Sequence, residues 1–351
     1  MYTNRNRAYG VLVAIFCVVL ILGGVTASAS AQEEIVVCNW GGEFAKTQRV
    51  AFFDPFEKET GIKVKTVSFP EFAKMKAMVT SGNIEWDVVD AEEKWLVRGV
   101  KEGLFEPLDY TVIDSKDILE GGVYPYGVGN YSYAHPIVYN TKKFSEQNHP
   151  RNWQEFWDVK TFPGPRSLYN NPAISLEQAL LADGVSPDKL YPLDVERAFK
   201  SLDKIKPHIL TWFKGITQAA QLMSQQEVDL ISASHARMYF IRKEGAPVGI
   251  EMNQAIGDRT FWVVLKGTKR KSIAMKLINY ITRAKPQSDW VNLYPMSPSN
   301  KSAYNLIKSE IQPFLPTSPQ NIKKIVWLNS QWWVDNEAKI FERWNEWMLK
   351  K

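Results

Sequence analysis

Apolar residues along the chain follow two spacings, one typical of strands and one typical of helices. Short apolar runs predict buried strands, and apolar residues three or four positions apart predict helices. The predicted strands cover 35–38, 62–67, 87–90, 228–232 and 261–265. The predicted helices cover 44–60, 72–79, 95–102, 175–183, 195–205, 218–226, 237–243, 272–282 and 331–350. Strands that alternate with helices indicate an α/β fold whose parallel sheet is covered on both faces.

Two segments depart from this rhythm. Residues 104–136 are rich in turn-forming residues and predict irregular chain, with an extended segment at 131–139. The last helix carries large apolar residues at helical spacing: Trp333, Ile340, Phe341, Trp344, Trp347 and Met348. Such a stripe is typical of core packing rather than of a binding face.

The first residues predict a cleaved secretory signal peptide spanning 1–31. Arg5 and Arg7 precede an apolar run at 11–25, and Ala29-Ser30-Ala31 forms a small-residue cleavage pattern. The alternative is a membrane anchor, but the run is shorter than the roughly 20 residues that span a bilayer. Cleavage would remove Cys17 and leave Cys38 alone, so no intramolecular disulfide is expected. The apolar surroundings of Cys38 predict a buried thiol.

Composition and motifs exclude several classes of function. A net charge of +5 on 351 residues, without a basic cluster outside Lys269-Arg270-Lys271, argues against a nucleic-acid binder. The chain has no zinc-binding histidine pattern, nucleophile elbow, phosphate loop or dinucleotide motif. We therefore expect no metal, no cofactor and no enzymatic activity. An aromatic content of 13% makes a ring-lined ligand cleft plausible.

Several short segments point to a family through their order and spacing. They are Asn39-Trp40, Phe56-x-Lys58-Glu59-Thr60-Gly61-Ile62-Lys63-Val64, Trp86-Asp87-Val88-Val89, Lys101-Glu102-Gly103-Leu104, Val138-Tyr139-Asn140-Thr141, Trp153-x-x-Phe156-Trp157, Phe162-Pro163-Gly164, Glu244-Gly245-Ala246-Pro247, Phe261-Trp262, Tyr294-Pro295 and Asn300-Lys301. Together they resemble the periplasmic solute-binding proteins of ABC importers, in the spermidine/putrescine-binding branch.

The resemblance implies a type II periplasmic binding protein fold, in which two α/β lobes enclose a ligand cleft. Residues 32–137 and 263–310 are expected to form lobe one, 138–262 lobe two, and 311–351 C-terminal helices that pack across the lobes. It further implies a monomer in the periplasm that captures a small solute and delivers it to an ABC permease in the inner membrane. A ligand-sensing module or an exported enzyme remains an alternative.

The resemblance also assigns candidate ligand-binding residues. Polyamine-binding relatives place aromatic rings against the alkyl chain and acidic groups against the ammonium groups. The matching rings are Trp40, Trp262, Tyr294 and Trp333, and the matching acid is Glu92, with Glu93 possible through a one-residue ambiguity. Tyr131 and Ser132, where the extended segment begins, are expected to line the cleft from the hinge side, together with Tyr133.

Other positions differ from the polyamine-binding pattern. Val264 replaces an expected acid, Asn170 lies where an acidic loop is expected, and Ser234 replaces an expected Trp. Arg237 follows closely and would favour a carboxylate. Arg166 and Arg259 are further candidates, although a surface position is favoured for each. The main interpretation is therefore a polyamine or related polar solute; the alternative is an amino-acid-like zwitterion or a small organic acid.

Overall fold

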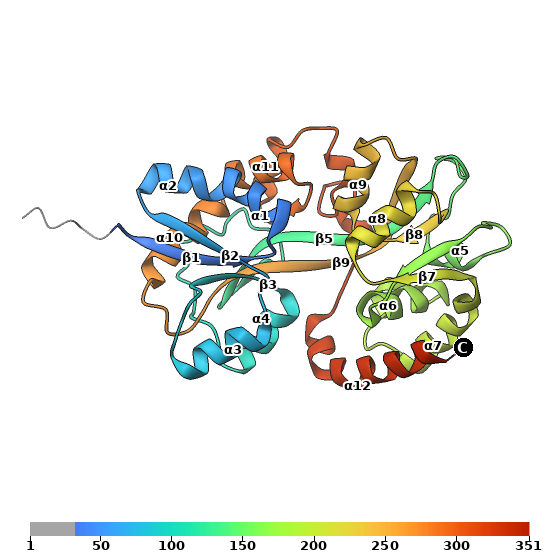
Figure 1. The fold of residues 1–351 in the computed structure, drawn as a ribbon, viewed down its shortest axis with the longest axis horizontal. Helices are drawn as coiled ribbons and strands as arrows, with labels where there is room; N and C mark the ends of the chain where they lie inside the picture. The colour runs from blue at the N-terminus through green and yellow to red at the C-terminus, as the bar shows by residue number, and fades with distance from the viewer. Residues whose placement is uncertain (1–31, 351) are drawn as a thin grey trace, which may run out of the picture. The chain divides into compact units, whose positions relative to one another are not determined.

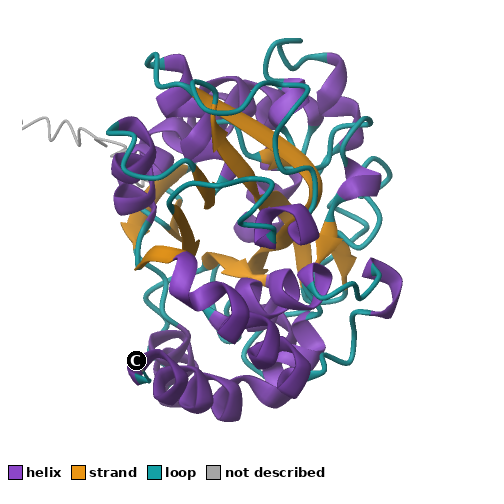
Figure 2. Cartoon of the chain, turned by 90° about the vertical axis from the view of Figure 1, so that its right-hand side faces the viewer, coloured by secondary structure: helices purple, strands orange, loops and turns teal. Residues whose placement is uncertain are grey.

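The computed structural model describes residues 32–350, so the predicted signal peptide lies outside the described residues. From Glu33 onward the chain forms one compact unit in which helices cover both faces of a sheet (Figures 1 and 2). Among the described residues, no helix combines the length and apolar character needed to cross a membrane.

Eleven strands of the described chain form one sheet in the order β2-β1-β3-β9-β5-β8-β6-β7, with β4 and β10 paired to β5 and β11 paired to β9. The strands are β1 (Glu34–Asn39), β2 (Lys63–Ser68), β3 (Val88–Glu92), β4 (Val123–Tyr124), β5 (Gly127–Asn140), β6 (Arg166–Tyr169), β7 (Ile209–Phe213), β8 (Leu230–Ser232), β9 (Val248–Val264), β10 (Ser297–Pro298) and β11 (Val326–Trp327).

The helices flank this sheet. They are α1 (Gly42–Gln48), α2 (Asp54–Thr60), α3 (Phe72–Ser81), α4 (Glu93–Lys101), α5 (Trp153–Trp157), α6 (Pro172–Ala182), α7 (Val195–Ile205), α8 (Ile216–Ser224), α9 (His235–Lys243), α10 (Lys271–Ile281), α11 (Ala284–Leu293) and α12 (Ser330–Leu349). A π-helical turn, η1 (Arg49–Phe53), joins α1 to α2, and short 3₁₀ turns are η2 (Pro187–Lys189), η3 (Lys206–His208), η4 (Lys301–Asn305), η5 (Gln312–Phe314) and η6 (Ile322–Lys324).

The sheet is parallel only toward its two ends, which corrects the expectation of a parallel sheet. β1 pairs in parallel with β2 and β3, and β6 pairs in parallel with β7 and β8. Between them, β5 and β9 are antiparallel to each other from Val128↔Trp262 to Asn140↔Val248. We call the part around β1–β3 the first lobe and the part around β6–β8 the second lobe; β5 and β9 run between them (Figure 1).

Both long strands extend far beyond their predicted lengths. β5 begins at Gly127, inside the segment predicted to be irregular, and β9 begins at Val248 rather than near Phe261. Polar residues such as Asn253 and Asp258 interrupt the apolar pattern of β9. Pairing with β5 satisfies the backbone of β9 without requiring apolar side chains. Local hydrophobicity is therefore a poor guide to this strand.

Helix α12 packs on the second lobe through the apolar stripe predicted from its sequence. Trp333, Trp344 and Trp347 are buried in one core cluster with residues of α6 and α7. The opposite side of the same helix forms ion pairs with α4 of the first lobe, Glu337 with Lys94 and Asp335 with Lys101. The lobe boundaries predicted from the sequence stay predictions.

Arg166 is neither on the surface nor in a cleft, contrary to both expectations. It is fully buried and its guanidinium donates to the carbonyl oxygens of Phe156 and Phe162. Its role is therefore to satisfy backbone acceptors inside the second lobe. Cys38 is fully buried as predicted, and burial raises the pKa of its thiol to about 12.

Asp90 is a fully buried carboxyl group on β3. Burial raises its pKa to about 8, although polar groups of Asn130, Thr260 and Trp40 favour the charged form. Neither carboxyl oxygen accepts a hydrogen bond from the described residues. The folded protein therefore holds a proton on Asp90 at a pH where the unfolded chain has lost it.

This proton makes the stability depend on pH. Because the pKa of Asp90 is raised on folding, its favourable contribution is complete below pH 4 and is lost as pH rises toward 8. In Asp90→Asn this loss should disappear. The unfolding free energy of the variant, relative to wild type, should rise between pH 5 and pH 8 by on the order of 1 kcal/mol per pH unit.

Denaturant unfolding of both proteins across this pH range measures the difference. Other buried titrating groups are common to the two proteins and cancel. Asp289→Asn, at a residue with an exposed side chain paired to Lys285, is the control and should show a constant difference. A constant difference for Asp90→Asn would contradict the prediction.

Candidate functional site

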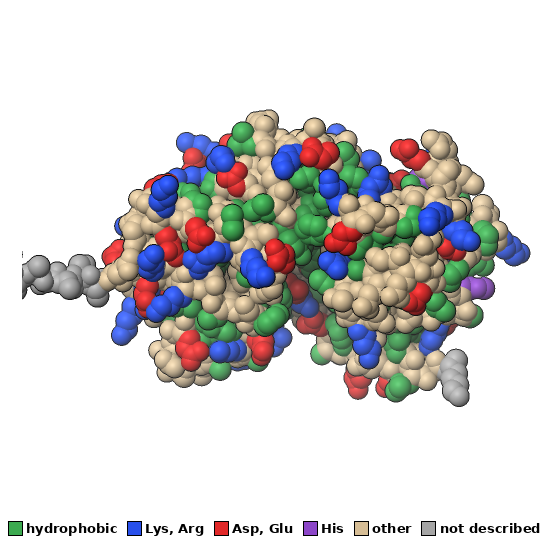
Figure 3. Space-filling model, turned by 45° about the horizontal axis from the view of Figure 1, so that its top comes forward, with side chains coloured by type: hydrophobic (Ala, Val, Ile, Leu, Met, Phe, Trp, Pro, Cys, Tyr) green, Lys and Arg blue, Asp and Glu red, His purple; other side chains and the backbone are tan. Residues whose placement is uncertain are grey.

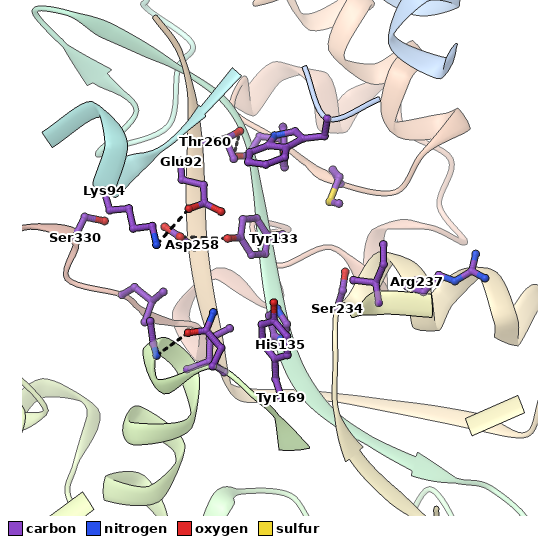
Figure 4. Close-up of a pocket in the computed structure, with 18 of the residues that line it drawn as sticks. Glu92, Lys94, Tyr133, His135, Tyr169, Ser234, Arg237, Asp258, Thr260 and Ser330 are labelled. Atoms are coloured by element: carbon purple, nitrogen blue, oxygen red, sulfur yellow. Dashed lines mark hydrogen bonds and ion pairs between the residues drawn. The ribbon is translucent and has the colours of Figure 1, made fainter. Parts of the chain in front are cut away.

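A cavity of about 350 Å³ lies between the two lobes, beside the stretch where β5 and β9 run from one lobe to the other. Figure 3 shows the surface hollowed between the lobes, with charged side chains inside the hollow. Side chains from β3, α4, β5, β9, α9 and α12 line it (Figure 4). A small molecule held here would contact residues of both lobes.

Aromatic rings form much of the wall. On the first lobe Trp40 packs against Trp95 with ring centroids 5.7 Å apart. On the second lobe Tyr169 lies between His135 and Phe213 in a stack, at centroid distances of 5.6 and 5.2 Å. Flat rings of this kind bury the carbon chain of a ligand and attract a cation over their faces.

The turn after β1 holds Trp40 in place. Gly41 has φ +75°, and a Cβ there would lie 2.9 Å from the Ser68 side chain. Only glycine fits this close approach and left-handed backbone. The turn therefore directs Trp40 from the end of β1 toward the cavity.

Three charged side chains, two acidic and one basic, form ion pairs on one side of the cavity. The Lys94 ammonium lies 2.9 Å from a Glu337 carboxylate oxygen and 3.7 Å from one of Glu92. The pKa of Lys94 is raised above its ordinary value. Burial opposes this shift, but the two nearby carboxylates outweigh the effect of burial. Burial raises the pKa of Glu92, with Lys94 opposing. This cluster links α4 to α12 across the two lobes.

Asp258 is a second acidic centre, on β9. It is buried, it accepts a hydrogen bond of 3.2 Å from the Tyr133 hydroxyl, and its other oxygen accepts from the Arg259 backbone N–H. Burial, together with the nearby Glu92 and Glu93 carboxylates, raises the pKa of Asp258 to about 8. No basic side chain of the described residues forms an ion pair with Asp258 within 4 Å. A cation in the cavity would stabilise the charged form of Asp258.

Arg237 and Ser234 lie at the start of α9. In the view of Figure 4 they stand on the other side of β5 from Glu92 and Asp258. Arg237 is half-buried, and its guanidinium forms no ion pair with any residue from 32 to 350. Ser234 precedes the first helical residue, and its hydroxyl caps no backbone N–H. Both side chains thus keep hydrogen-bonding capacity for a ligand.

A buried histidine positions these two residues. His235 Nδ1 accepts a hydrogen bond from the Ala134 N–H at 3.2 Å, and Nε2 is 2.9 Å from the Pro295 carbonyl oxygen, which assigns the proton to Nε2. Burial lowers its pKa to about 4. The neutral ring therefore ties α9 to β5 and to the loop carrying Tyr294.

Most residues proposed from the sequence line this cavity. They are Trp40, Glu92, Tyr131, Ser234, Arg237, Tyr294 and Trp333. The ambiguity between neighbouring acids is resolved, because Glu93 turns away, accepts a hydrogen bond from Tyr124 and lies 3.6 Å from Arg259. Arg259 itself stacks on Trp327 outside this cavity. That the lining residues bind a ligand stays a prediction.

Three proposed residues lie elsewhere. Ser132 does not line this cavity; it lines a second cavity of about 410 Å³, to which Tyr131 and Thr260 also contribute. Asn170 accepts a hydrogen bond from Trp344 of α12, and Asn171 lines the site instead.

Trp262 is the third residue that lies outside the cavity. It is fully buried in the first-lobe core, although it shares a strand face with Asp258 and Thr260. The alternation of side chains along β9 would allow Trp262 to face the cavity. However, Trp262 lies further along β9, opposite Asp90 of β3. The cavity ends before that point. Asp258 and Thr260 of β9 line the cavity where Trp262 was expected.

Lys94, Asp258, Tyr169, Phe213 and Glu337 were not among the proposed site residues, yet all line the cavity. A signal for Asp258 exists in the sequence, since an acidic residue lies shortly before the apolar run 261–265 that predicts a strand. The position of Glu337 gave no such signal, because it lies on the polar side of a helix. No group of three potential metal ligands is present in residues 32–350.

Known proteins share both sequence and fold with this chain. A gamma-aminobutyric acid-binding protein of Pseudomonas aeruginosa is 34% identical over 341 residues, covering 94% of this chain and 96% of the relative. The spermidine/putrescine-binding periplasmic protein 1 of Haemophilus influenzae is 25% identical over 322 residues, covering 86% and 85%. The higher identity to the gamma-aminobutyric acid-binding protein favours the alternative interpretation, an amino-acid-like ligand, over a polyamine.

Solved structures agree with the fold expected from the sequence. An ABC transporter substrate-binding protein from Bradyrhizobium japonicum has a TM-score of 0.85 at 38% identity, covering 90% of this chain and 99% of its own. The Atu4243-GABA receptor has a TM-score of 0.84 at 36% identity, covering 91% and 98%. The model of the bacterial extracellular solute-binding protein family matches residues 51–317. The chain belongs to the bacterial extracellular solute-binding protein family and has its α/β periplasmic binding protein fold.

Proposed function

We propose that this protein is the periplasmic substrate-binding component of an ABC importer and that it captures a small zwitterion resembling γ-aminobutyric acid (GABA). One observation carries the proposal. Asp258 and Arg237 are an acidic and a basic side chain that line one cavity and form no ion pair among the described residues, and an ammonium group beside Asp258 would favour its charged form. Buried or half-buried charges without partners are costly, so a ligand that pairs with both is favoured.

The acidic end suits an ammonium group. Asp258 offers a carboxylate, and Tyr133 holds it in place by a hydrogen bond. Charge-assisted hydrogen bonds to a carboxylate are roughly twice as strong as neutral ones. The face of Trp40 in the same wall would add an attraction of about 0.5–2 kcal/mol for a cation.

The basic end suits a carboxylate. The planar Arg237 guanidinium can donate two parallel hydrogen bonds to one carboxylate. The Ser234 hydroxyl and the amino end of α9 lie on the same side and favour negative charge. The distance between the acidic and basic groups would then select the length of the ligand.

The position of the cavity connects binding with delivery. A ligand held by Asp258 on β9 and Arg237 on α9 draws together parts that move when β5 and β9 bend. The ligand would stabilise the closed arrangement because it contacts more groups there. Relatives named as an ABC transporter substrate-binding protein and a GABA-binding protein support this role.

The first test is binding to the purified chain from Gln32 onward. GABA should raise the melting temperature and give a saturable isothermal titration, because the ligand binds only the folded protein. At about 100 times its Kd the expected stabilisation is about 2.7 kcal/mol. Putrescine, with two ammonium groups, should give a much weaker response. Tight putrescine binding without GABA binding would refute the proposal in favour of the polyamine alternative.

The second test removes the basic end. Arg237→Gln keeps a polar side chain but deletes its charge and its guanidinium, so the affinity for GABA should fall by at least about tenfold, since a hydrogen bond to a charged group contributes about 1.5–3 kcal/mol. Titration calorimetry measures the change. Lys243→Gln, an exposed position on the same helix, is the matched control and should bind as wild type does. Equal affinities of Arg237→Gln and wild type would exclude Arg237 from the site.

Transport distinguishes an importer component from a ligand-sensing module. With the cognate permease and ATPase in vesicles, the loaded protein should stimulate ATP hydrolysis and solute uptake. A protein that binds GABA yet stimulates neither would support the sensing alternative.

A further inference from the structure

The side-chain ammonium of Lys94 is a positively charged group in the wall of the cavity. Lys94 lines the cavity, and its ammonium lies between Glu337 of α12 and Glu92 at the end of β3. All three side chains are only about one-quarter to one-third exposed. Figure 4 shows the Lys94 side chain pointing toward Glu92 and Asp258 rather than outward.

We propose that Lys94 is a specificity-determining residue whose ammonium occupies the place that the second ammonium of a diamine would need. This inference rests on the proposed function, since it explains why a site with three acidic side chains would accept a zwitterion and reject a polyamine. Specificity of this kind arises from a repulsive element built against the competitor.

The charges in the cavity support the assignment. Without Lys94, Glu92, Glu337 and Asp258 would present three carboxyl groups against Arg237 alone. A diamine would then find one acidic partner for each ammonium. With Lys94 present, Glu92 and Glu337 share one positive charge, and only Asp258 has no basic partner. A second ligand ammonium would also approach a like charge, which is unfavourable in a partly desolvated site.

A second ion pair between α4 and α12 allows the effect of Lys94 on ligand specificity to be distinguished from the effect of linking the two helices. Lys101 of α4 pairs with Asp335 of α12 at 2.8 Å, as Lys94 pairs with Glu337 at 2.9 Å. Lys101 and Asp335 do not line the cavity and are about half exposed. Both pairs connect the lobes, but of the two lysines only Lys94 lines the cavity.

The experiment titrates putrescine and GABA into wild type, Lys94→Met and Lys101→Met. Methionine keeps the apolar stem of lysine and removes its charge. Lys94→Met should lower the Kd for putrescine by at least about tenfold, and Lys101→Met should leave it at the wild-type value. Lys94→Arg, which keeps the cation, should continue to exclude putrescine.

Two outcomes would overturn the inference. One is a Lys94→Met protein that is folded and binds putrescine no better than wild type; the other is an equal gain in Lys101→Met, which would assign the effect to loss of the bridge. Lys94→Gln provides a second uncharged variant if Lys94→Met does not fold. A wild type that does not bind GABA, combined with a putrescine gain in Lys94→Met, would refute the proposed function and support the role of Lys94.

Discussion

The antiparallel pairing of β5 with β9 is the constraint on which the site depends. These two long strands run between the lobes, so the backbone of both lobes is joined along one ladder. Side chains alternate along a strand, and this places Tyr131 and Tyr133 of β5 on the cavity side together with Asp258 and Thr260 of β9. Bending of the same two strands would change the separation of the lobes, which couples closure to occupancy of the cavity.

In the proposed function, the pairing of charges inside the cavity decides which ligands it accepts. Counting side chains alone suggests a site for a polycation, because three acids line it. The structure divides them differently, since two of the acids share Lys94 and only Asp258 has no basic partner within reach. Arg237 then becomes the complementary charge. A scaffold shared with polyamine-binding proteins can in this way serve a ligand of another charge, because the fold does not determine the ligand.

The similarities to known proteins also separate the fold from the ligand. Relatives at 34% and 25% identity are named for different solutes. Departures seen in the sequence at Ser234 and Arg237 fall on the cavity wall, whereas Val264 falls in the core and has no direct part in the site.

The sequence by itself determined the α/β class, most helices and the ring in the turn after β1, because these depend on local spacing and on residues near one another in the chain. It also indicated that polyamine-type acids are missing. Tertiary structure decided the parts that depend on long-range pairing. β9 is a strand because β5 pairs with it, Trp262 is core because the cavity ends before it, and Lys94 meets Glu337 because α12 packs back beside α4. Contacts between residues this far apart in sequence leave no periodic signal, so only the folded chain shows them.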